Sequence, residues 1–379
     1  MTMCHIIHLT PVGRGAVSSL LVEGCAAATM VDRFFRGANG RSLTQAALNR
    51  IYFGHWYHEG CQVAEEVIVC RRAADQIEIH CHGGLSAFTS IENSLRNAGC
   101  CNIAWPEWLQ CRTVDPLNSA ARIALAQAKT GRVTHILLDQ MQGAMRQEIR
   151  TLVELLQDQK LAAAQERLNR LLERAQLGLH LVDPWRIVLA GQPNVGKSSL
   201  MNALLGYSRS IVRDQPGTTR DMISTETAFG GWPVELNDSA GLGTGTDPVE
   251  KAGVQLAWNL IRESDQVILV FDATLPWTEE QQRLFSEIPS ALVVHNKVDG
   301  NRLFLNQRPE GLLTSTVSGQ GIQELSARLE ALLVPKPPPA GAAVPCDLDQ
   351  VQVLREAMSS LVLGATETAS SELRRLLSD

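Results

Sequence analysis

The sequence predicts an α+β domain, followed by a helical domain that an α/β domain interrupts. Three observations support this order. Residues 1–113 alternate short apolar strands with a helical stretch, residues 114–183 carry apolar side chains at helical spacing, and residues 184–334 alternate strand and helix patterns. The last pattern is typical of a parallel sheet with crossover helices. Residues 346–379 are again helical and would complete the helical domain.

The composition is that of an ordinary globular protein. The 379 residues are 45% hydrophobic and 20% charged, and the net charge is −6. Because basic residues are not in excess, any contact with nucleic acid must use a local patch. Eight of the nine cysteines lie in the first 111 residues without regular spacing, which favours reduced thiols. Without a signal-peptide layout or an apolar run of about 18 residues, we expect a cytoplasmic protein with no membrane contact.

In the first domain the spacing predicts strands at residues 6–9, 17–22, 67–70 and 77–80 and a helix at 85–98. His80, Cys81, His82 and the pair Cys100-Cys101 suggest a metal site as one alternative. Their spacing fits none of the common zinc patterns, and adjacent strand residues point to opposite faces. We therefore expect buried thiols and a backbone turn there.

The helical segments carry apolar residues at steps of three or four, as in Met141, Met145, Ile149, Leu152 and Leu156. Residues 161–175 and 351–361 show the same spacing. Such stripes are typical of helices that pack one face into a bundle. Asp183-Pro184 ends the first helical part, and the proline-rich residues 335–341 predict a stiff linker before the second.

A phosphate-binding loop is predicted directly after the strand at residues 185–190. Residues 191–198 fit the pattern G-x-x-x-x-G-K-[S/T]. Its glycines allow backbone N–H groups to turn toward a phosphate. Lys197 would place its charge on the β- and γ-phosphates, Ser198 would bind Mg²⁺, and the helix after them would direct its N-terminus at the anion. The expected ligand contacts in the loop are Gly191, Asn194, Val195, Gly196, Lys197, Ser198 and Ser199.

Two further motifs would complete the phosphate side of the site. In residues 217–221, Thr218 or Thr219 would reach Mg²⁺ and the γ-phosphate, as in a switch loop. Asp238-Ser239-Ala240-Gly241 follows a strand. There Asp238 would hold Mg²⁺ through water, and the Gly241 N–H would meet the γ-phosphate.

Two later motifs would select the base. The Asp299 carboxylate in Asn296-Lys297-Val298-Asp299 would accept guanine N1–H and the 2-amino group, which adenine lacks, so it selects GTP. Lys297 would cover the base, and Ser315 and Thr316 would offer backbone to the guanine oxygen. Each motif alone also occurs in ordinary loops. Five in order at strand ends predict a guanine-nucleotide site, and therefore an α/β P-loop GTPase domain.

The hydrolytic residue is not the usual glutamine. Leu242 follows the Asp-Ser-Ala-Gly motif, and an apolar side chain cannot orient a water molecule. Glu250, beyond a segment rich in Gly and Thr, is a candidate for orienting the attacking water. The alternative is that Glu250 is a solvated residue in the first turn of a helix that begins after Pro248.

The chain resembles the MnmE (TrmE) family of tRNA-modification GTPases over most of its length. Residues 10–16 match that family's Thr-Pro-x-Gly-Arg-Gly-Ala motif, and residues 82–84 match its His-Gly-Gly turn. Residues 217–221 and 247–253 match two more of its segments. A GTPase domain inserted in a helical domain, behind an N-terminal folate-binding-like α+β domain, is the architecture that the resemblance implies.

The resemblance also implies a function and partners. The family modifies C5 of the wobble uridine of tRNA together with an MnmG (GidA) protein that carries FAD. Its N-terminal domain dimerises and binds a tetrahydrofolate derivative, for which Arg14 is the matching candidate here. Asn194 matches a K⁺ ligand that acts where an arginine finger would, and Glu250 matches the catalytic glutamate. The implied catalytic residues are thus Glu250, Lys197 and Asn194.

One departure keeps a second interpretation open. The family ends in Cys-Ile-Gly-Lys, and its cysteine is needed for the tRNA chemistry. This chain ends Arg374-Arg375-Leu376-Leu377-Ser378-Asp379, and its last cysteine is Cys346. The alternative is a regulatory or ribosome-associated GTPase switch without tRNA-modifying activity. Ribosome-assembly GTPases usually carry an added RNA-binding module, however, and the sequence has no downstream Gly-x-x-Gly clamp with basic flanks.

Overall fold

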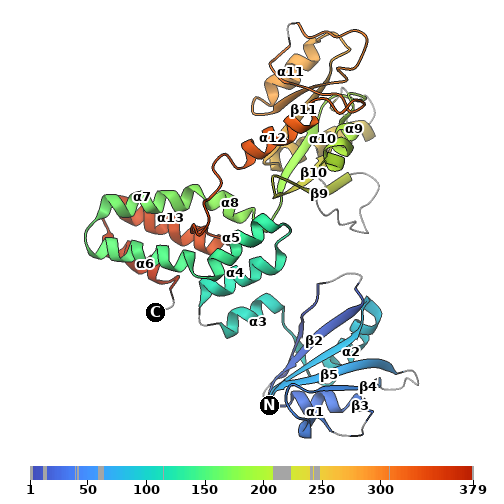
Figure 1. Cartoon of the computed structure of the whole chain (residues 1–379), viewed down its shortest axis with the longest axis vertical. Helices are drawn as coiled ribbons and strands as arrows, with labels where there is room; N and C mark the ends of the chain where they lie inside the picture. The colour runs from blue at the N-terminus through green and yellow to red at the C-terminus, as the bar shows by residue number, and fades with distance from the viewer. Residues whose placement is uncertain are drawn as a thin grey trace. The chain divides into compact units, whose positions relative to one another are not determined.

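The computed structural model divides the chain into two compact units, residues 1–114 and 115–379 (Figure 1). The structure describes residues 3–11, 15–38, 40, 42–58, 64–113, 115–207, 223–239, 242, 248–306 and 308–377, with the side chains of 223 and 248–252 left out. The first unit ends close to the expected limit of the α+β domain. The second holds both the helical and the α/β parts of the chain.

A seven-stranded sheet, in the order β3-β4-β5-β6-β2-β1-β7, forms the first unit. Its strands are β1 (His5–His8), β2 (Val17–Glu23), β3 (Phe35–Gly37), β4 (Ile51–Trp56), β5 (Glu65–Ala73), β6 (Gln76–His82) and β7 (Cys101–Asn102). Neighbouring strands are antiparallel except β1 and β7, which are parallel. The sequence patterns had indicated β1, β2, β5 and β6 but not the edge strands β3 and β7 or the β4 strand.

Helices α1 (Ala27–Asp32), α2 (Leu85–Asn97) and α3 (Trp105–Arg112) and the short 3₁₀ helix η1 (Leu43–Gln45) complete this unit. Ile91 and Leu95 of α2 are fully buried in one core with Ile77 and Ile79 of β6. Cys81 lies in the same core, and burial raises the pKa of its thiol to about 11. Among the residues that the structure describes, no group of three or more His, Cys, Asp or Glu side chains could hold a metal ion.

A six-stranded sheet, in the order β13-β12-β11-β8-β10-β9, organises the α/β part of the second unit. Its strands are β8 (Trp185–Ala190), β9 (Ile223–Phe229), β10 (Trp232–Asp238), β11 (Gln266–Asp272), β12 (Leu292–Asn296) and β13 (Leu312–Leu313). Its helices are α9 (Lys197–Tyr207), α10 (Pro248–Glu263), α11 (Glu279–Glu287) and α12 (Ile322–Leu333).

The expectation of a wholly parallel sheet is wrong at one edge, because β9 runs antiparallel to β10. The other pairs, from β10 to β13, are parallel. Gly230 and Gly231 join β9 to β10 with positive φ angles of 55° and 84°. Two such residues in a two-residue loop match the twist of a hairpin, so the chain folds straight back without a crossover helix.

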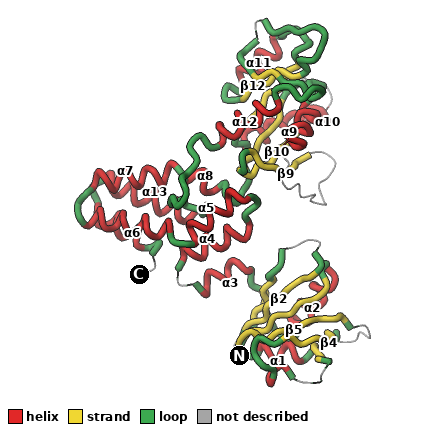
Figure 2. Tube along the Cα trace, viewed as in Figure 1, coloured by secondary structure: helices red, strands yellow, loops and turns green. Residues whose placement is uncertain are grey.

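Seven helices form the rest of the second unit in the described part of the chain. They are α4 (Pro116–Gln127), α5 (Gly131–Met141), α6 (Ala144–Gln157), α7 (Leu161–Glu173), α8 (Ala175–Leu179), α13 (Leu348–Val362) and α14 (Thr366–Arg374). Leu152 of α6, Leu168 of α7, Leu354 of α13 and Leu373 of α14 share one buried core. Figure 2 shows α6, α7 and α13 as neighbouring helices.

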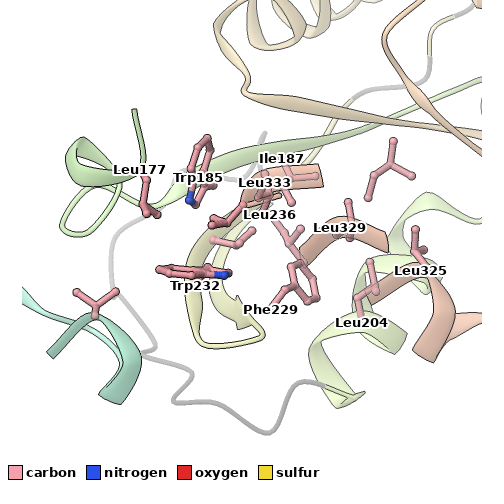
Figure 3. Close-up of a cluster of buried hydrophobic side chains, with 14 of the residues drawn as sticks. Leu177, Trp185, Ile187, Leu204, Phe229, Trp232, Leu236, Leu325, Leu329 and Leu333 are labelled. Carbon is pink, nitrogen blue, oxygen red and sulfur yellow. The ribbon is translucent and has the colours of Figure 1, made fainter. Parts of the chain in front are cut away.

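A second core joins these helices to the sheet. Leu137 of α5 and Leu177 of α8 belong to the same buried cluster as Trp232 of β10 and Leu329 of α12. Figure 3 shows Leu177 and Trp232 together with the side chains of the sheet and of α12. Because burial of shared apolar surface favours both parts at once, the sheet and the first helices stabilise each other.

The segment that returns from the sheet to the helical part is partly buried. Val344 is fully buried, and Cys346 is 8% exposed. The buried Gln140 side chain donates to the carbonyl of Ala342 at 3.0 Å and accepts the Val344 N–H at 3.0 Å. The predicted linker at residues 335–341 is therefore followed by a stretch fixed against α5.

Candidate nucleotide-binding site

The site lies at the carboxyl edge of the parallel strands. Strand β8 ends at Ala190, and α9 begins at Lys197, so the intervening loop caps the edge. The neighbouring strands β10 and β11 end at Asp238 and Asp272, and β12 ends at Asn296. Because parallel strands end on the same side, their terminal polar residues converge there.

Two glycines of the loop occupy positions that only glycine fits. Gly191 has a φ of 148°, and a Cβ there would lie 2.3 Å from the carbonyl oxygen of Val270. Gly196 has a φ of 95°, and its Cβ would lie 2.5 Å from Nδ2 of Asn296. The loop can therefore adopt this path because both residues lack a side chain.

Lys197 lies across the loop. Its side chain is buried, and Nζ donates to the carbonyls of Gly191 and Gln192 at 3.2 Å each. Burial lowers the pKa of Lys197, and the nearby Asp238 carboxylate offsets part of this effect. An anion in the loop would supply the opposite charge that a buried ammonium lacks.

Ser198 and Asp238 form a hydroxyl–carboxylate pair, in which Ser198 Oγ donates to Asp238 Oδ2 at 2.5 Å. The other carboxylate oxygen, Oδ1, is buried and has no hydrogen-bond partner among the described residues. A buried acceptor without a partner is costly. Since hydroxyl and carboxylate oxygens are the ligands that Mg²⁺ prefers, these residues fit a magnesium ion.

Asn296 connects the phosphate loop to the loop after β13. It is fully buried, its Nδ2 donates to the carbonyl of Val195 at 3.1 Å, and its Oδ1 accepts from Thr314 Oγ1 at 3.2 Å. Both polar ends of the amide are thus used inside the protein. In this arrangement Asn296 positions the two loops relative to each other.

Lys297 makes the next connection, to the rim of the phosphate loop. It has a positive φ of 65°, and its Nζ donates to the carbonyl of Asn194 at 2.6 Å and to Asp272 Oδ2 at 2.7 Å. Asp272 was not predicted from the sequence. Its position at the end of a buried strand, two residues before Thr274, is the signal that could have identified it.

The electrostatics of Asp272 follow from these contacts. Its side chain is almost fully buried, and burial alone would raise the pKa of the carboxyl. Hydrogen bonds from Lys297 and Thr274 outweigh burial, so the pKa lies below its usual range. Asp272 is therefore a charged anchor for Lys297 at neutral pH.

The remaining predicted base contacts lie beside this anchor. Asp299 is exposed, Ser315 is fully buried and Thr316 is half-buried. Ser315 Oγ accepts the N–H groups of Val317 and Ser318 at 3.2 and 3.1 Å, so it shapes the turn of its own loop. The exposure of Asp299 is compatible with its predicted role as a base contact.

Several predicted residues lie outside the description. Arg14, Thr218, Thr219 and Gly241 are not among the described residues, and only the backbone of Glu250, in the first turn of α10, is described. Their expected roles stay predictions. Asn194 is exposed at the loop rim with a positive φ of 64°.

Cys346, the last cysteine of the sequence, is buried. Burial, and then the neighbouring Asp347, raise its pKa to about 12. A thiol that is buried and protonated at neutral pH is a poor nucleophile. Within the described parts of the chain, no helix has the length and apolarity needed to span a bilayer.

The loop, the Ser198–Asp238 pair and the Asn296–Lys297 loop define the class of P-loop GTPases. The family model described as "50S ribosome-binding GTPase" matches residues 186–297. The chain is 32% identical to tRNA modification GTPase MnmE of Geobacillus kaustophilus, over 85% of this chain and 80% of the relative. It is 29% identical to that of Bacillus subtilis, over 85% and 81%. The chain belongs to the MnmE family of tRNA modification GTPases.

A solved structure of the G domain of the T. maritima FeoB iron transporter is also similar to this chain. It is 28% identical, with a TM-score of 0.30, and the match covers 39% of this chain and 98% of that domain.

Proposed function

We propose that this chain binds and hydrolyses GTP and thereby acts in modification of C5 of the wobble uridine of tRNA. The observation that carries the proposal is one strand edge that brings together Lys197, the Ser198–Asp238 pair and the Lys297–Asp272 pair. Membership of the MnmE family supports the tRNA part. We also propose that the chain acts in the cytoplasm.

In this proposal each described residue has a task in binding. Lys197 and the N–H groups of residues 194–199 hold the β- and γ-phosphates. Ser198 and Asp238, with Thr219, hold Mg²⁺, which neutralises charge on the phosphates. Asp299 accepts the guanine N–H groups, and the stem of Lys297 covers the base while its Nζ stays on Asp272.

Hydrolysis requires a residue that orients water. Leu242 is buried in the core beneath the sheet edge, with an exposed fraction of 6%, so it cannot take this role. We assign the role to Glu250, which matches the family's catalytic glutamate. Asn194 is exposed at the loop rim and is the proposed ligand of a K⁺ ion that acts where an arginine finger would.

The proposed domains follow the same scheme. The GTPase domain, residues 184–334, is inserted in a helical domain formed by residues 114–183 and 346–379, and the shared core of α6, α7, α13 and α14 supports this. The first domain, residues 1–113, would bind a tetrahydrofolate derivative with Arg14. Its exposed apolar residues Ile51 and Phe53 support dimerisation. An MnmG-like FAD protein would be the partner.

The decisive experiment is genetic. The gene is deleted in its source organism, and wobble-uridine modifications in total tRNA are measured by mass spectrometry. We expect loss of the C5 modification, restored by the wild-type gene but not by Lys197→Ala, which removes the phosphate-binding charge. Unchanged modification after deletion, with no second homologue present, would contradict the proposal.

Unchanged tRNA modification after the deletion would favour a second candidate function. In it, the chain is a regulatory or ribosome-associated GTPase switch that does not modify tRNA. The observation in its favour is Cys346. Its buried thiol, whose pKa is raised, is a poor nucleophile and does not suit a reactive cysteine in the tRNA chemistry.

A further inference from the structure

The helical part contains a cavity that the nucleotide site does not use. It has a volume of about 490 Å³ and lies between the start of α6, the last turns of α7 and residues 341–343. Three arginines line it, Arg167 and Arg170 of α7 and Arg174 at the C-cap of that helix, and Glu148 is its one acidic residue. Their spacing of three and four residues places the three guanidinium groups on one face of the helix.

A second cavity of about 410 Å³ shares Arg170 and Arg174 with the first as lining residues. Its other wall is formed by residues 333–339, which add Lys336. We call the two cavities together the basic groove. It holds four cationic side chains and two carboxylates, Glu148 and Glu173, whereas the whole chain has a net charge of −6.

The cations of the basic groove are not all engaged inside the protein. Arg167 is paired with Glu148 at 2.8 Å, and Arg174 donates to the carbonyl of Ala343 at 2.9 Å. Arg170 has a side chain that is 52% exposed, and its one contact with an acidic residue in the described part of the chain is with the exposed Glu166 at 3.8 Å. A guanidinium has five N–H donors, and those of Arg170 are the least engaged of the three arginines. Arg170 is therefore the side chain of the basic groove that is most available to a ligand.

Further donors line the same groove. Helix α6 begins after Gly143 without a side-chain cap and without an acidic residue in its first turn, which leaves its first N–H groups to other acceptors. Guanidinium and backbone donors together suit an acceptor-rich anion.

We infer that the basic groove binds the phosphate backbone of an RNA strand. Each of the two cavities already has the volume of a small-molecule site. Two cavities that share arginines suit the consecutive phosphates of a nucleic-acid strand better than they suit one free phosphate ion. The inference rests on the proposed function only in taking tRNA as the RNA. It supplies the local basic patch that an acidic chain needs in order to bind nucleic acid.

The test compares Arg170→Ala with Arg150→Ala in the full chain. Arg150 is an exposed arginine of α6 that lines neither cavity, so its removal changes the net charge equally. Binding of fluorescently labelled, unmodified tRNA transcript is measured from 50 to 300 mM KCl. GTP hydrolysis without tRNA is measured in parallel and should be unchanged in both variants, since neither residue lies in the nucleotide site.

We expect Arg170→Ala to weaken tRNA binding roughly five- to eightfold at 0.1 M salt and to reduce the salt slope by about one, whereas Arg150→Ala changes neither. Equal effects of the two variants would overturn the inference. So would complete displacement of tRNA by inorganic phosphate at constant ionic strength, because a free-phosphate site would then explain the groove. Unchanged wobble-uridine modification after gene deletion, together with tRNA binding that depends on Arg170, would instead count against the proposed function alone.

Discussion

At the level of single residues, the candidate site depends on a chain of contacts that begins at Asp272. Its carboxylate fixes Lys297, and Lys297 in turn holds the carbonyl of Asn194 in the phosphate loop. The base-reading loop and the phosphate loop are thus connected before a nucleotide binds. Such preorganisation lowers the entropy cost of ligand binding.

Asp272→Asn tests this anchor through the pH dependence of stability. Hydrogen bonds to a charged group contribute about 1–3 kcal/mol, so we expect the variant to be less stable by about that amount at pH 7. Because the folded pKa of Asp272 is lowered, its contribution is present above the unfolded pKa and is lost as the pH falls through the folded value. Urea unfolding at pH 7 and near pH 3 should show that the difference in unfolding free energy between wild type and variant is smaller at the lower pH. A difference that stays constant would contradict the role of Asp272 as a charged anchor.

At the level of elements, the strand ends and the glycines of the loop set the geometry. Gly196→Ala adds a Cβ 2.5 Å from Asn296 Nδ2 at a φ of 95°, so the loop must shift away from the buried amide. We expect GTP affinity, measured by calorimetric titration, to fall more than about tenfold, and stability to fall by about 2 kcal/mol.

The matched control is Gly206→Ala. Gly206 lies in α9, and a Cβ there would meet nothing within 4 Å. Alanine is the better helix former, so this variant should be more stable by about 0.5–1 kcal/mol and should bind GTP unchanged. If Gly206→Ala lost GTP affinity as Gly196→Ala does, the effect would belong to α9 as a whole and not to the loop.

The elements also show how far local sequence can predict this site. Lys197, Asp238 and Asn296 each belong to a short motif beside a strand, so their common edge follows from the parallel topology. The pair Asp272–Lys297 was missed because it depends on the alignment of β11 with β12, in which Asp272 lies opposite Asn296.

The hairpin of β9 and β10 was missed although Gly230-Gly231 is a local signal for it. Gln140 and Val344 are 204 residues apart, and no local pattern predicts their contact.

At the level of the whole molecule, the hydrophobic cores divide the chain differently from the sequence patterns. The core of the first unit draws its buried residues from positions 4–100, whereas one core of the second unit extends from Ala121 to Cys346. The helical and nucleotide-binding parts therefore share apolar surface, although their sequence patterns differ. We expect them to unfold together and the first unit to unfold separately.

Scanning calorimetry of Leu137→Ala and Leu95→Ala checks this division. Both leucines are fully buried, one in each unit, and each substitution should cost about 2–5 kcal/mol. Leu137→Ala, in α5, should lower the melting temperature of the transition that GTP stabilises, and Leu95→Ala should lower only the other. A GTP-stabilised transition that does not respond to Leu137→Ala would separate the helices from the nucleotide-binding part.

The central claim is that this strand edge binds GTP and recognises guanine through Asp299. The most direct test measures the affinities of wild type and Asp299→Asn for GTP and for xanthosine triphosphate, whose 2-oxo group replaces the 2-amino group. Because an amide can donate to that oxygen, we predict that the variant prefers xanthosine triphosphate while wild type prefers GTP, each by at least about a hundredfold. Unchanged GTP affinity in Asp299→Asn would contradict the account.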